Sequence, residues 1–259
     1  METPSPIRPI RRSKGRLAKL VRGAIGILVA VLVLGLLASV FPMMSTASFY
    51  NYRLEDVDQD GLKNAMDPDV DNDGLDNIDD NDSDGDYVPN YQDIVQNALE
   101  LDGRRYDFLR GHLWNYGGRI GLMVDIDVVN IAYEKAGIYL DRLMAEDYAK
   151  NPDTYDIMND NTPKNPFFRR RVRNLFIFLE NTNRLARAHR LPAPGDLIFY
   201  SHPEAKRRPA HVVLVTRVTN DDRVFVMQGS MKHGLKEVLE SDVRERGFEP
   251  MHYGELLGY

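Results

Sequence analysis

The chain contains no cysteine among its 259 residues. Disulfide bonds, a lipoprotein anchor on cysteine, thiolate zinc sites and a cysteine nucleophile are therefore excluded. Serine and threonine are absent between Leu101 and Asp153, so that stretch offers no hydroxyl nucleophile. Basic residues are almost missing from Glu55 to Asp93, where Lys63 stands against fifteen acidic residues and the local charge is −14. The whole chain carries −6, so charge is strongly separated along it.

The N-terminal region combines a basic tail with an apolar run. Seven basic residues within 1–22 precede Gly23 to Val40, which is uncharged and mostly aliphatic. With its neighbours this run can span about 30 Å of hydrocarbon. Basic residues before it and acidic residues after it predict a cytoplasmic N-terminus. We therefore expect residues 23–42 to be a single transmembrane signal anchor in a bacterial inner membrane, with the rest of the chain periplasmic or otherwise extracytoplasmic.

Two other interpretations of the apolar run stay open. The small residues Ser45, Thr46 and Ala47 would suit a signal peptidase, so the run is alternatively a cleaved signal peptide. A buried core helix is the second alternative, but the basic tail immediately before the run fits a membrane surface better.

Four segments follow from composition: a basic tail (1–22), the membrane helix (23–42), acidic repeats (50–93) and a domain of ordinary size (94–259). Helical periodicity is present around Ile94 to Leu99, Val128 to Ala132 and Val172 to Leu179. Short β-branched or aromatic runs then occur at 196–200, 212–218 and 224–227. Helices followed by strands predict an α+β domain with an antiparallel sheet.

Two acidic stretches, at residues 56–67 and 69–80, have the spacing of calcium loops. Each has carboxylates at loop positions 1, 3 and 5, glycine at position 6, asparagine at position 9 and aspartate at position 12. Calcium takes six to eight oxygen ligands, which such a loop supplies from a short segment. The expected ligands are Asp56, Asp58, Asp60, Asn64 and Asp67 in the first loop and Asp69, Asp71, Asp73, Asn77 and Asp80 in the second.

A third copy has a less complete pattern. If Gly85 is taken as position 6, the carboxylates at positions 1, 3 and 5 are those of Asp80, Asp82 and Asp84. Positions 9 and 12 then hold an apolar and an aromatic residue, so this loop is incomplete or borrows Asp86 or Asp93.

The loops follow one another too closely to be ordinary EF-hands with flanking helices. Their spacing resembles the type 3 calcium repeats of thrombospondins, in which consecutive loops share ions. A solvated acidic linker is the alternative, since charge runs usually are that. We expect this segment to be disordered without metal and to form a stiff spacer with calcium.

The C-terminal domain resembles a known bacterial family. Pro194, Gly195 and Asp196 lead into one predicted strand, and His211 opens the next. This combination is similar to papain-like cell-wall peptidases and amidases of the NlpC type. More closely, residues 98–259 resemble the family named domain of unknown function 1287. The matching stretches are 98–107, 116–125, 132–147, 169–175 and the two strands.

The resemblance implies a papain-like fold but also a lost nucleophile. The family motif GVCTDVV would place cysteine where this chain has Met123. A thioether has no proton to lose, so cysteine-type acyl transfer is excluded. His211 would then be a base with nothing to activate, and Asp125 and Gln228 are the remaining polar groups of a degenerate site.

Further residues in this domain have several interpretations. Trp114 and Tyr116 are candidate cleft walls or core residues. A zinc site would need His211 with Asp125 or with the histidines at 202, 233 and 252, but no paired metal-ligand spacing supports it. The basic run from Arg169 to Arg173 predicts a helix start with a basic outer face, or contact with an anionic glycan, a carboxylate-bearing peptide or the acidic repeats.

The sequence therefore predicts a membrane-anchored, calcium-binding envelope protein with a catalytically inactive papain-like domain. Peptidoglycan peptide or another envelope protein is the expected partner, and no nucleic acid is expected. Two alternatives remain, a cell-wall peptide hydrolase with a non-cysteine mechanism and a purely structural scaffold.

Overall fold

The computed structural model describes residues 21–35, 52–107, 122–156, 160–187, 191–202 and 208–255. They belong to two compact units, Met1–Met44 and Ser45–Tyr259. In the first unit, residues 21–35 are helical, and their large apolar side chains are exposed on all sides. Within the described residues, every helix is too short or too polar to cross a membrane. Residues 36–42 of the expected anchor and the basic residues 1–20 lie outside the described part.

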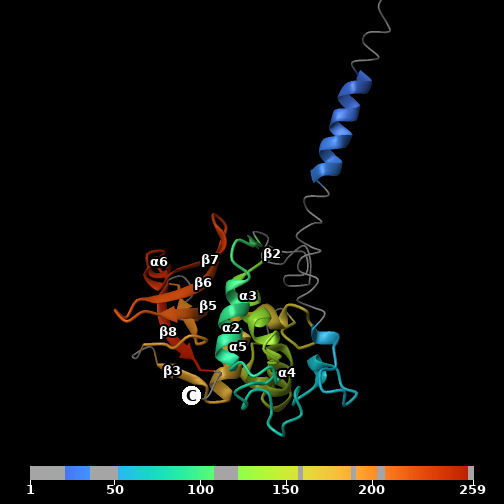
Figure 1. Cartoon of the computed structure of the whole chain (residues 1–259). Coiled ribbons are helices and arrows are strands. Elements are labelled where there is room, and N and C mark those ends of the chain that lie inside the picture. The colour runs from blue at the N-terminus through green and yellow to red at the C-terminus, as the bar shows by residue number, and fades with distance from the viewer. Residues whose placement is uncertain are drawn as a thin grey trace, which may run out of the picture. The chain divides into compact units, whose positions relative to one another are not determined.

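The second unit is an α+β domain in which α2 to α5 lie on one side of an antiparallel sheet and α6 lies on the other (Figure 1). Its helices are α2 (Asn90–Leu99), α3 (Asp125–Glu134), α4 (Leu140–Lys150), α5 (Val172–Asn181) and α6 (Glu240–Arg244). Short 3-10 turns occur at η1 (Tyr52–Leu54), η2 (Asn64–Met66), η3 (Pro152–Thr154) and η4 (Phe168–Arg170). The helices predicted around 94–99, 128–132 and 172–179 are thus present.

Six strands form the main sheet in the order β3-β8-β4-β5-β6-β7, and all described pairs are antiparallel. Their bounds are β3 (Leu185–Arg187), β4 (Leu197–Ser201), β5 (Pro209–Val218), β6 (Val224–Ser230), β7 (Gly234–Leu239) and β8 (Glu249–Gly254). Two short parallel strands, β1 (Arg105–Tyr106) and β2 (Leu122–Met123), lead into α3. The predicted α+β class with an antiparallel sheet is confirmed.

Strand alternation divides the apolar residues into two clusters. Along β5, Val212 and Leu214 face the helices and join the larger cluster, whereas Val213 and Val215 join a smaller cluster on the opposite face. Successive side chains on a strand point to opposite faces, so both faces of the central strands are covered. This explains why β4 and most of β5 are buried throughout.

Four elements were not predicted. For α4 the sequence does hold a signal, because Leu140, Leu143, Met144 and Tyr148 have helical spacing and pack in the core. The strands β7 and β8 contain glycine and several polar residues, and β3 has three residues. These strands form because neighbouring strands offer backbone hydrogen bonds, a contribution that is invisible in the local sequence.

Candidate functional site

Three aspartate loops repeat along residues 56–93 with a period of 13 residues. Each loop brings three carboxylates together, with oxygen atoms of the three side chains within 4.8 Å of one another. The backbone repeats as well, since position 4 of each loop has a positive φ between 59° and 69° and position 6 one between 71° and 97°. The three triads are Asp56, Asp58 and Asp60, then Asp69, Asp71 and Asp73, then Asp82, Asp84 and Asp86.

The third loop begins two residues later than the sequence indicates. Its first carboxylate is that of Asp82, whose Oδ2 accepts the N–H of Tyr87 at 2.9 Å. The same bond, from position 6 to position 1, joins Gly61 to Asp56 and Gly74 to Asp69 in the other loops. Asp80 is therefore position 12 of the second loop, and the third loop is complete.

Gly85, expected at position 6, lies at position 4 of the third loop with a φ of +69°. A methyl group added there would lie 2.7 Å from Cβ of Asp71 in the second loop. Glycine is thus needed both for the left-handed backbone and for the close approach of neighbouring loops. Position 6 is Tyr87, whose side chain is 94% exposed.

Position 9 has a structural role in all three loops. The side-chain oxygens of Asn64, Asn77 and Asn90 accept backbone N–H groups of position 2 at 2.8–3.1 Å, and their amide nitrogens donate to earlier carbonyls. Asn64 and Asn77 were expected to be metal ligands. Their buried side chains instead hold the loops closed.

The inward oxygens of the loops are the feature that points to a cation. In the first and third loops, carboxylate oxygens at positions 1, 3 and 12 are buried and have no hydrogen-bond partner among the described residues, and in the second loop this holds for position 12. Buried polar atoms in proteins are normally paired, because desolvation without a partner costs about 1–3 kcal/mol each. These oxygens belong to Asp56, Asp58, Asp67, Asp80, Asp82, Asp84 and Asp93.

Electrostatics places each position 12 residue beside its loop, since in the second loop burial raises the pKa of Asp71, and Asp73 and Asp80 raise it further. Burial raises the pKa of Asp67, and Asp60 and Asp58 raise it further. The pKa of Asp93 is raised to about 6 by burial together with Asp86 and Asp82. Each loop therefore concentrates four carboxylates, which repel one another unless a cation lies between them.

Replacing Tyr87 by glycine should tighten the third loop. A left-handed backbone costs a non-glycine residue about 1–2 kcal/mol, partly offset by the greater freedom of glycine when unfolded. We expect the third loop of Tyr87→Gly to bind its cation about two- to fivefold more tightly, as measured by isothermal titration calorimetry. Tyr87→Phe keeps the strain and serves as the control. Equal affinities for the two variants would contradict this explanation.

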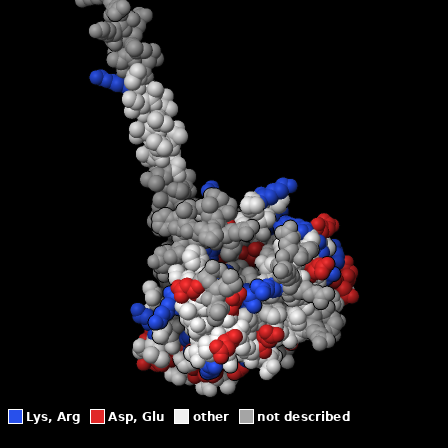
Figure 2. Space-filling view, turned by 180° about the vertical axis from the view of Figure 1, so that it is seen from behind, with Lys and Arg blue, Asp and Glu red and all other residues white. Residues whose placement is uncertain are grey.

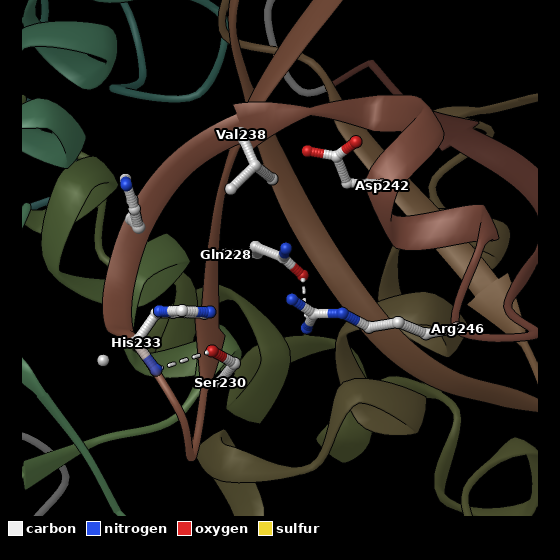
Figure 3. Close-up of a pocket in the computed structure, with 8 residues that line it drawn as sticks. Gln228, Ser230, His233, Val238, Asp242 and Arg246 are labelled. Carbon is white, nitrogen blue, oxygen red and sulfur yellow. Dashed lines mark hydrogen bonds between the residues drawn. The ribbon is translucent and has the colours of Figure 1, made fainter.

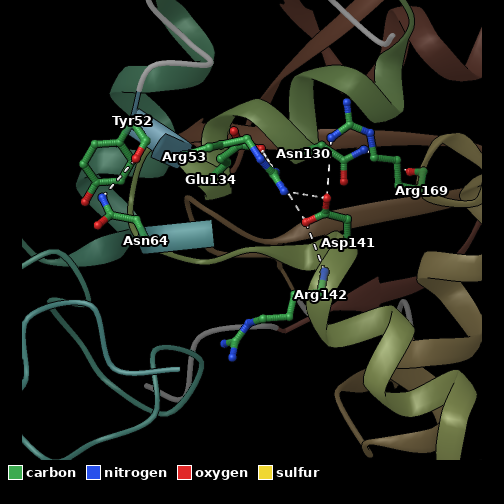
Figure 4. A network of polar contacts seen from close by, with 8 residues as sticks. All are labelled: Tyr52, Arg53, Asn64, Asn130, Glu134, Asp141, Arg142 and Arg169. Atoms are coloured by element: carbon green, nitrogen blue, oxygen red, sulfur yellow. Dashed lines mark hydrogen bonds and ion pairs between the residues drawn. The ribbon is translucent and has the colours of Figure 1, made fainter. Parts of the chain in front are cut away.

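The aspartate loops are packed against the helices of the domain. Arg53, just before the first loop, forms ion pairs with Glu134 of α3 and Asp141 of α4, the latter at 2.9 Å (Figure 4). Its guanidinium also lies over the ring of Tyr139, 5.2 Å from the centroid. A methyl group on Gly137, which lies between α3 and α4, would be 2.8 Å from the carbonyl oxygen of Ser83 in the third loop. The loops are thus docked on the domain, where a stiff spacer was expected.

Because Arg53 and Glu134 form a buried pair, we expect the stability of the domain to depend on pH. Burial raises the pKa of Glu134 to about 7, because its effect is larger than the opposite effect of the positive charge on Arg53. A carboxyl group whose pKa is higher in the folded than in the unfolded protein stabilises the fold when the pH is below its unfolded-state pKa. This stabilisation is lost as the pH rises through its folded-state pKa. From pH 5 to pH 8, wild type should lose about 2 kcal/mol more stability than Glu134→Gln in saturating calcium. Urea unfolding at the two pH values measures the difference, and equal losses of stability in wild type and Glu134→Gln would contradict the prediction.

Around the expected degenerate site, Met123 and His211 have different surroundings. Met123 is fully buried within the main apolar cluster. His211 is 9% exposed and stacks on Phe248 with ring centroids 4.8 Å apart. Its Nδ1 lies 3.1 Å from Oδ2 of Asp125, and the other oxygen of Asp125 accepts the N–H of Gly229. Asp125 therefore joins the start of α3 to β5 and β6.

Gln228 makes no described contact with this pair. Its amide oxygen accepts Nη1 of Arg246 at 3.3 Å, and its side chain lines a pocket that neither Asp125 nor His211 lines. Trp114 and Tyr116 lie outside the described residues. Among the described residues, the groups with metal-binding geometry consist of aspartates alone, so the histidines at 202, 211, 233 and 252 are not gathered into a zinc site.

The basic run 169–173 is used inside the molecule. Arg170 is 4% exposed and binds Asp127 with two hydrogen bonds of 2.6 and 2.8 Å. The other three arginines contact Asp141, Asn161 and Asp156. On the face shown in Figure 2, basic side chains likewise lie beside acidic ones. The run therefore stabilises the domain, and its expected role as a basic outer face is wrong for Arg170.

Comparison with known proteins identifies one region of the chain. Residues 120–243 match the family described as domain of unknown function (DUF1287). The match is shorter than the resemblance over 98–259, and it begins after the aspartate loops and α2. No curated protein and no solved structure matches the chain.

Proposed function

We propose that this DUF1287 domain is carried by a calcium-binding module, in which one ion occupies each aspartate loop. The inward-facing, unpaired carboxylate oxygens carry the proposal, because a cation is the partner that all three loops lack. Each loop would bind calcium through its three triad carboxylates and the carboxylate at position 12. The position 12 ligands are Asp67, Asp80 and Asp93.

The donor set favours calcium over other metals. Calcium prefers hard oxygen ligands and tolerates irregular geometry, whereas magnesium requires a nearly ideal octahedron and retains its water. Zinc and copper prefer nitrogen and sulfur ligands, which the loops do not provide. The close spacing of the triads within 4.8 Å suits a single ion per loop.

A calcium titration of two matched variants tests the proposal. Asp71 and Asp76 lie in the same loop, but only Asp71 belongs to the triad. We expect isothermal titration calorimetry to show three ions per chain for wild type and for Asp76→Asn. Asp71→Asn should lose one of them. Equal effects of both variants would mean that net charge, and not ligation, governs binding.

The docked loops suggest what calcium does for the protein. Arg53 connects the N-terminal segment to α3 and α4 immediately before the first loop, and Asp93 of the third loop belongs to α2. Ions in the loops would therefore fix the chain between the N-terminal segment and the domain. We infer that calcium determines how the domain is held relative to its N-terminal attachment.

Membrane anchorage completes the proposed arrangement. The support is the apolar run 23–40 after seven basic residues, together with the exposed apolar side chains of helix 21–35. Ile27 and Leu34, for example, are 69% and 65% exposed. An apolar surface around a whole helix needs lipid or protein to cover it. The proposed location is a bacterial inner membrane with the domain outside the cytoplasm.

For the domain itself we propose a binding role rather than catalysis. A papain-like mechanism needs a thiol, and the chain has no cysteine. The buried, apolar position of Met123 gives no support for ligand binding at that point. The proposed partner is a peptidoglycan peptide or another envelope protein.

A digestion assay distinguishes this role from cell-wall hydrolysis. The calcium-loaded full chain, with and without zinc, should release no muropeptides from isolated cell walls. Release that disappears in His211→Ala would establish a hydrolase with a different mechanism. Release that persists in this variant would indicate a catalytic group elsewhere and would equally overturn the binding role.

A further inference from the structure

A polar pocket lies between the β6–β7 hairpin and α6 with Arg246, which follows that helix (Figure 3). In the strand register, Gln228 is opposite Lys236 and Ser230 is opposite Gly234, so these residues share one face of the sheet. Their neighbours Met227 and Leu235 face the helices and belong to the main apolar cluster. The pocket is therefore on the face turned away from α3, and it measures about 230 Å³.

Gln228 provides an unpaired hydrogen-bond donor at this pocket. The side chain is 2% exposed, yet its Nε2 has no partner among the described residues. Its oxygen accepts Nη1 of Arg246 at 3.3 Å, which orients the amide and leaves the nitrogen for another acceptor (Figure 3). A buried donor without an acceptor is unfavourable, so a bound acceptor would remove this cost.

Other groups around the pocket also donate. The hydroxyl oxygen of Ser230 accepts the N–H of His233 at 3.1 Å, so its own proton is available to a ligand. Lys236 and Arg246 add two positive charges, and Asp242 adds one negative charge. Donors and positive charge thus exceed acceptors, which is the chemistry that binds an oxyanion.

We propose that this pocket binds an oxyanion group, either a carboxylate or a phosphate monoester. Gln228 and Ser230 would donate neutral hydrogen bonds, while Arg246 and Lys236 would supply the charge. The volume is below the 300–1,000 Å³ that is usual for drug-sized ligands, which indicates a small ligand or the charged end of a longer one. The site is separate from the aspartate loops and does not depend on calcium binding.

Titration with acetate and with methyl phosphate tests the pocket. The calcium-loaded full chain, labelled with ¹⁵N, is used, and both probes remain soluble with calcium. We expect a saturable shift of the Gln228 side-chain amide resonances with at least one probe. The probe that binds more tightly identifies the ligand class. Absence of a saturable shift with both probes would overturn the proposal.

Variants separate a built site from general attraction of anions. Lys236→Gln and Arg246→Gln should each weaken binding about tenfold, as expected when a charge-assisted hydrogen bond is lost. Lys232→Gln removes the same charge from the same hairpin but does not line the pocket, so it should leave the affinity unchanged. Equal weakening by Lys232→Gln and Lys236→Gln would overturn the proposal. Thermal unfolding confirms that each variant is folded.

Gln228→Leu tests the neutral donor separately. The substitution keeps the approximate size of the side chain and removes its amide, so no net charge changes. We expect weaker binding of the preferred probe together with unchanged or greater stability, because the unpaired donor is gone. Unchanged affinity would show that Gln228 takes no part and that the pocket has no built oxyanion site.

Discussion

Chelation of calcium should lower the midpoint of thermal unfolding of the full chain by about 20 °C. Each ion at a hundredfold excess over its Kd stabilises the folded state by about 2.7 kcal/mol, so three ions contribute about 8 kcal/mol. This is comparable with the total stability of an ordinary domain, and about 1 kcal/mol corresponds to 2–4 °C at this size. Circular dichroism melting curves in calcium and in EGTA measure the effect.

Hydrogen exchange should show where stability is lost on chelation. Without ions, the carboxylates of the three triads repel one another, and few apolar residues in the loops oppose this. We expect amides of residues 57–88 to lose protection first, while the central strands β4 and β5 remain protected. Magnesium at the same concentration should restore little of the protection. Identical melting curves in calcium and EGTA would remove the basis of the calcium proposal.

Substitution of Arg170 by methionine should destabilise the domain by about 3–5 kcal/mol, because it leaves buried carboxylates without their partner. The side chains of Arg170 and Asp127 are 4% and 3% exposed, and Asp107 lies 3.3 Å from the same guanidinium. Asp127 also accepts the N–H of Val124 at the start of α3, so its position affects the helix. Urea unfolding in saturating calcium measures the loss.

Two further variants distinguish buried charge from lost packing. Arg173 pairs with Asp156 nearer the surface, with 36% and 29% of these side chains exposed, so Arg173→Met should cost less than about 1 kcal/mol. Adding Asp127→Asn to Arg170→Met removes one uncompensated charge and should recover part of the stability. Burial also raises the pKa of Asp127, so the loss in Arg170→Met should be larger at high pH. A pH-independent loss without recovery would indicate a packing effect.

The sequence by itself determined the chemistry of the aspartate loops and the α+β class. Alternating aspartates near glycine offer oxygen ligands alone wherever they fold, because the carboxylates are close together in the chain. The long apolar periodicity of α2, α3 and α5 likewise made these helices visible. Absence of cysteine excluded thiol catalysis without any reference to the structure.

The tertiary structure corrected the phase of the third loop. Every second residue from Asp80 to Asp86 is an aspartate, so positions 1, 3 and 5 of the loop can begin at either Asp80 or Asp82. The phase is set by Asn90, whose side chain accepts the N–H of Ser83, and by the bond from Tyr87 to Asp82. The 13-residue recurrence of asparagine at 64, 77 and 90 was the signal in the sequence that would have given this phase.

Long-range partners were likewise decided by the fold. Arg53 reaches Glu134 and Asp141 across more than 80 residues, and Asp125 reaches His211 and Gly229 across the sheet. Charge and spacing along a chain contain no information on such pairs, because helix packing and strand order bring them together. The docked loops, the internal arginines and the pocket at Gln228 therefore became visible only in three dimensions.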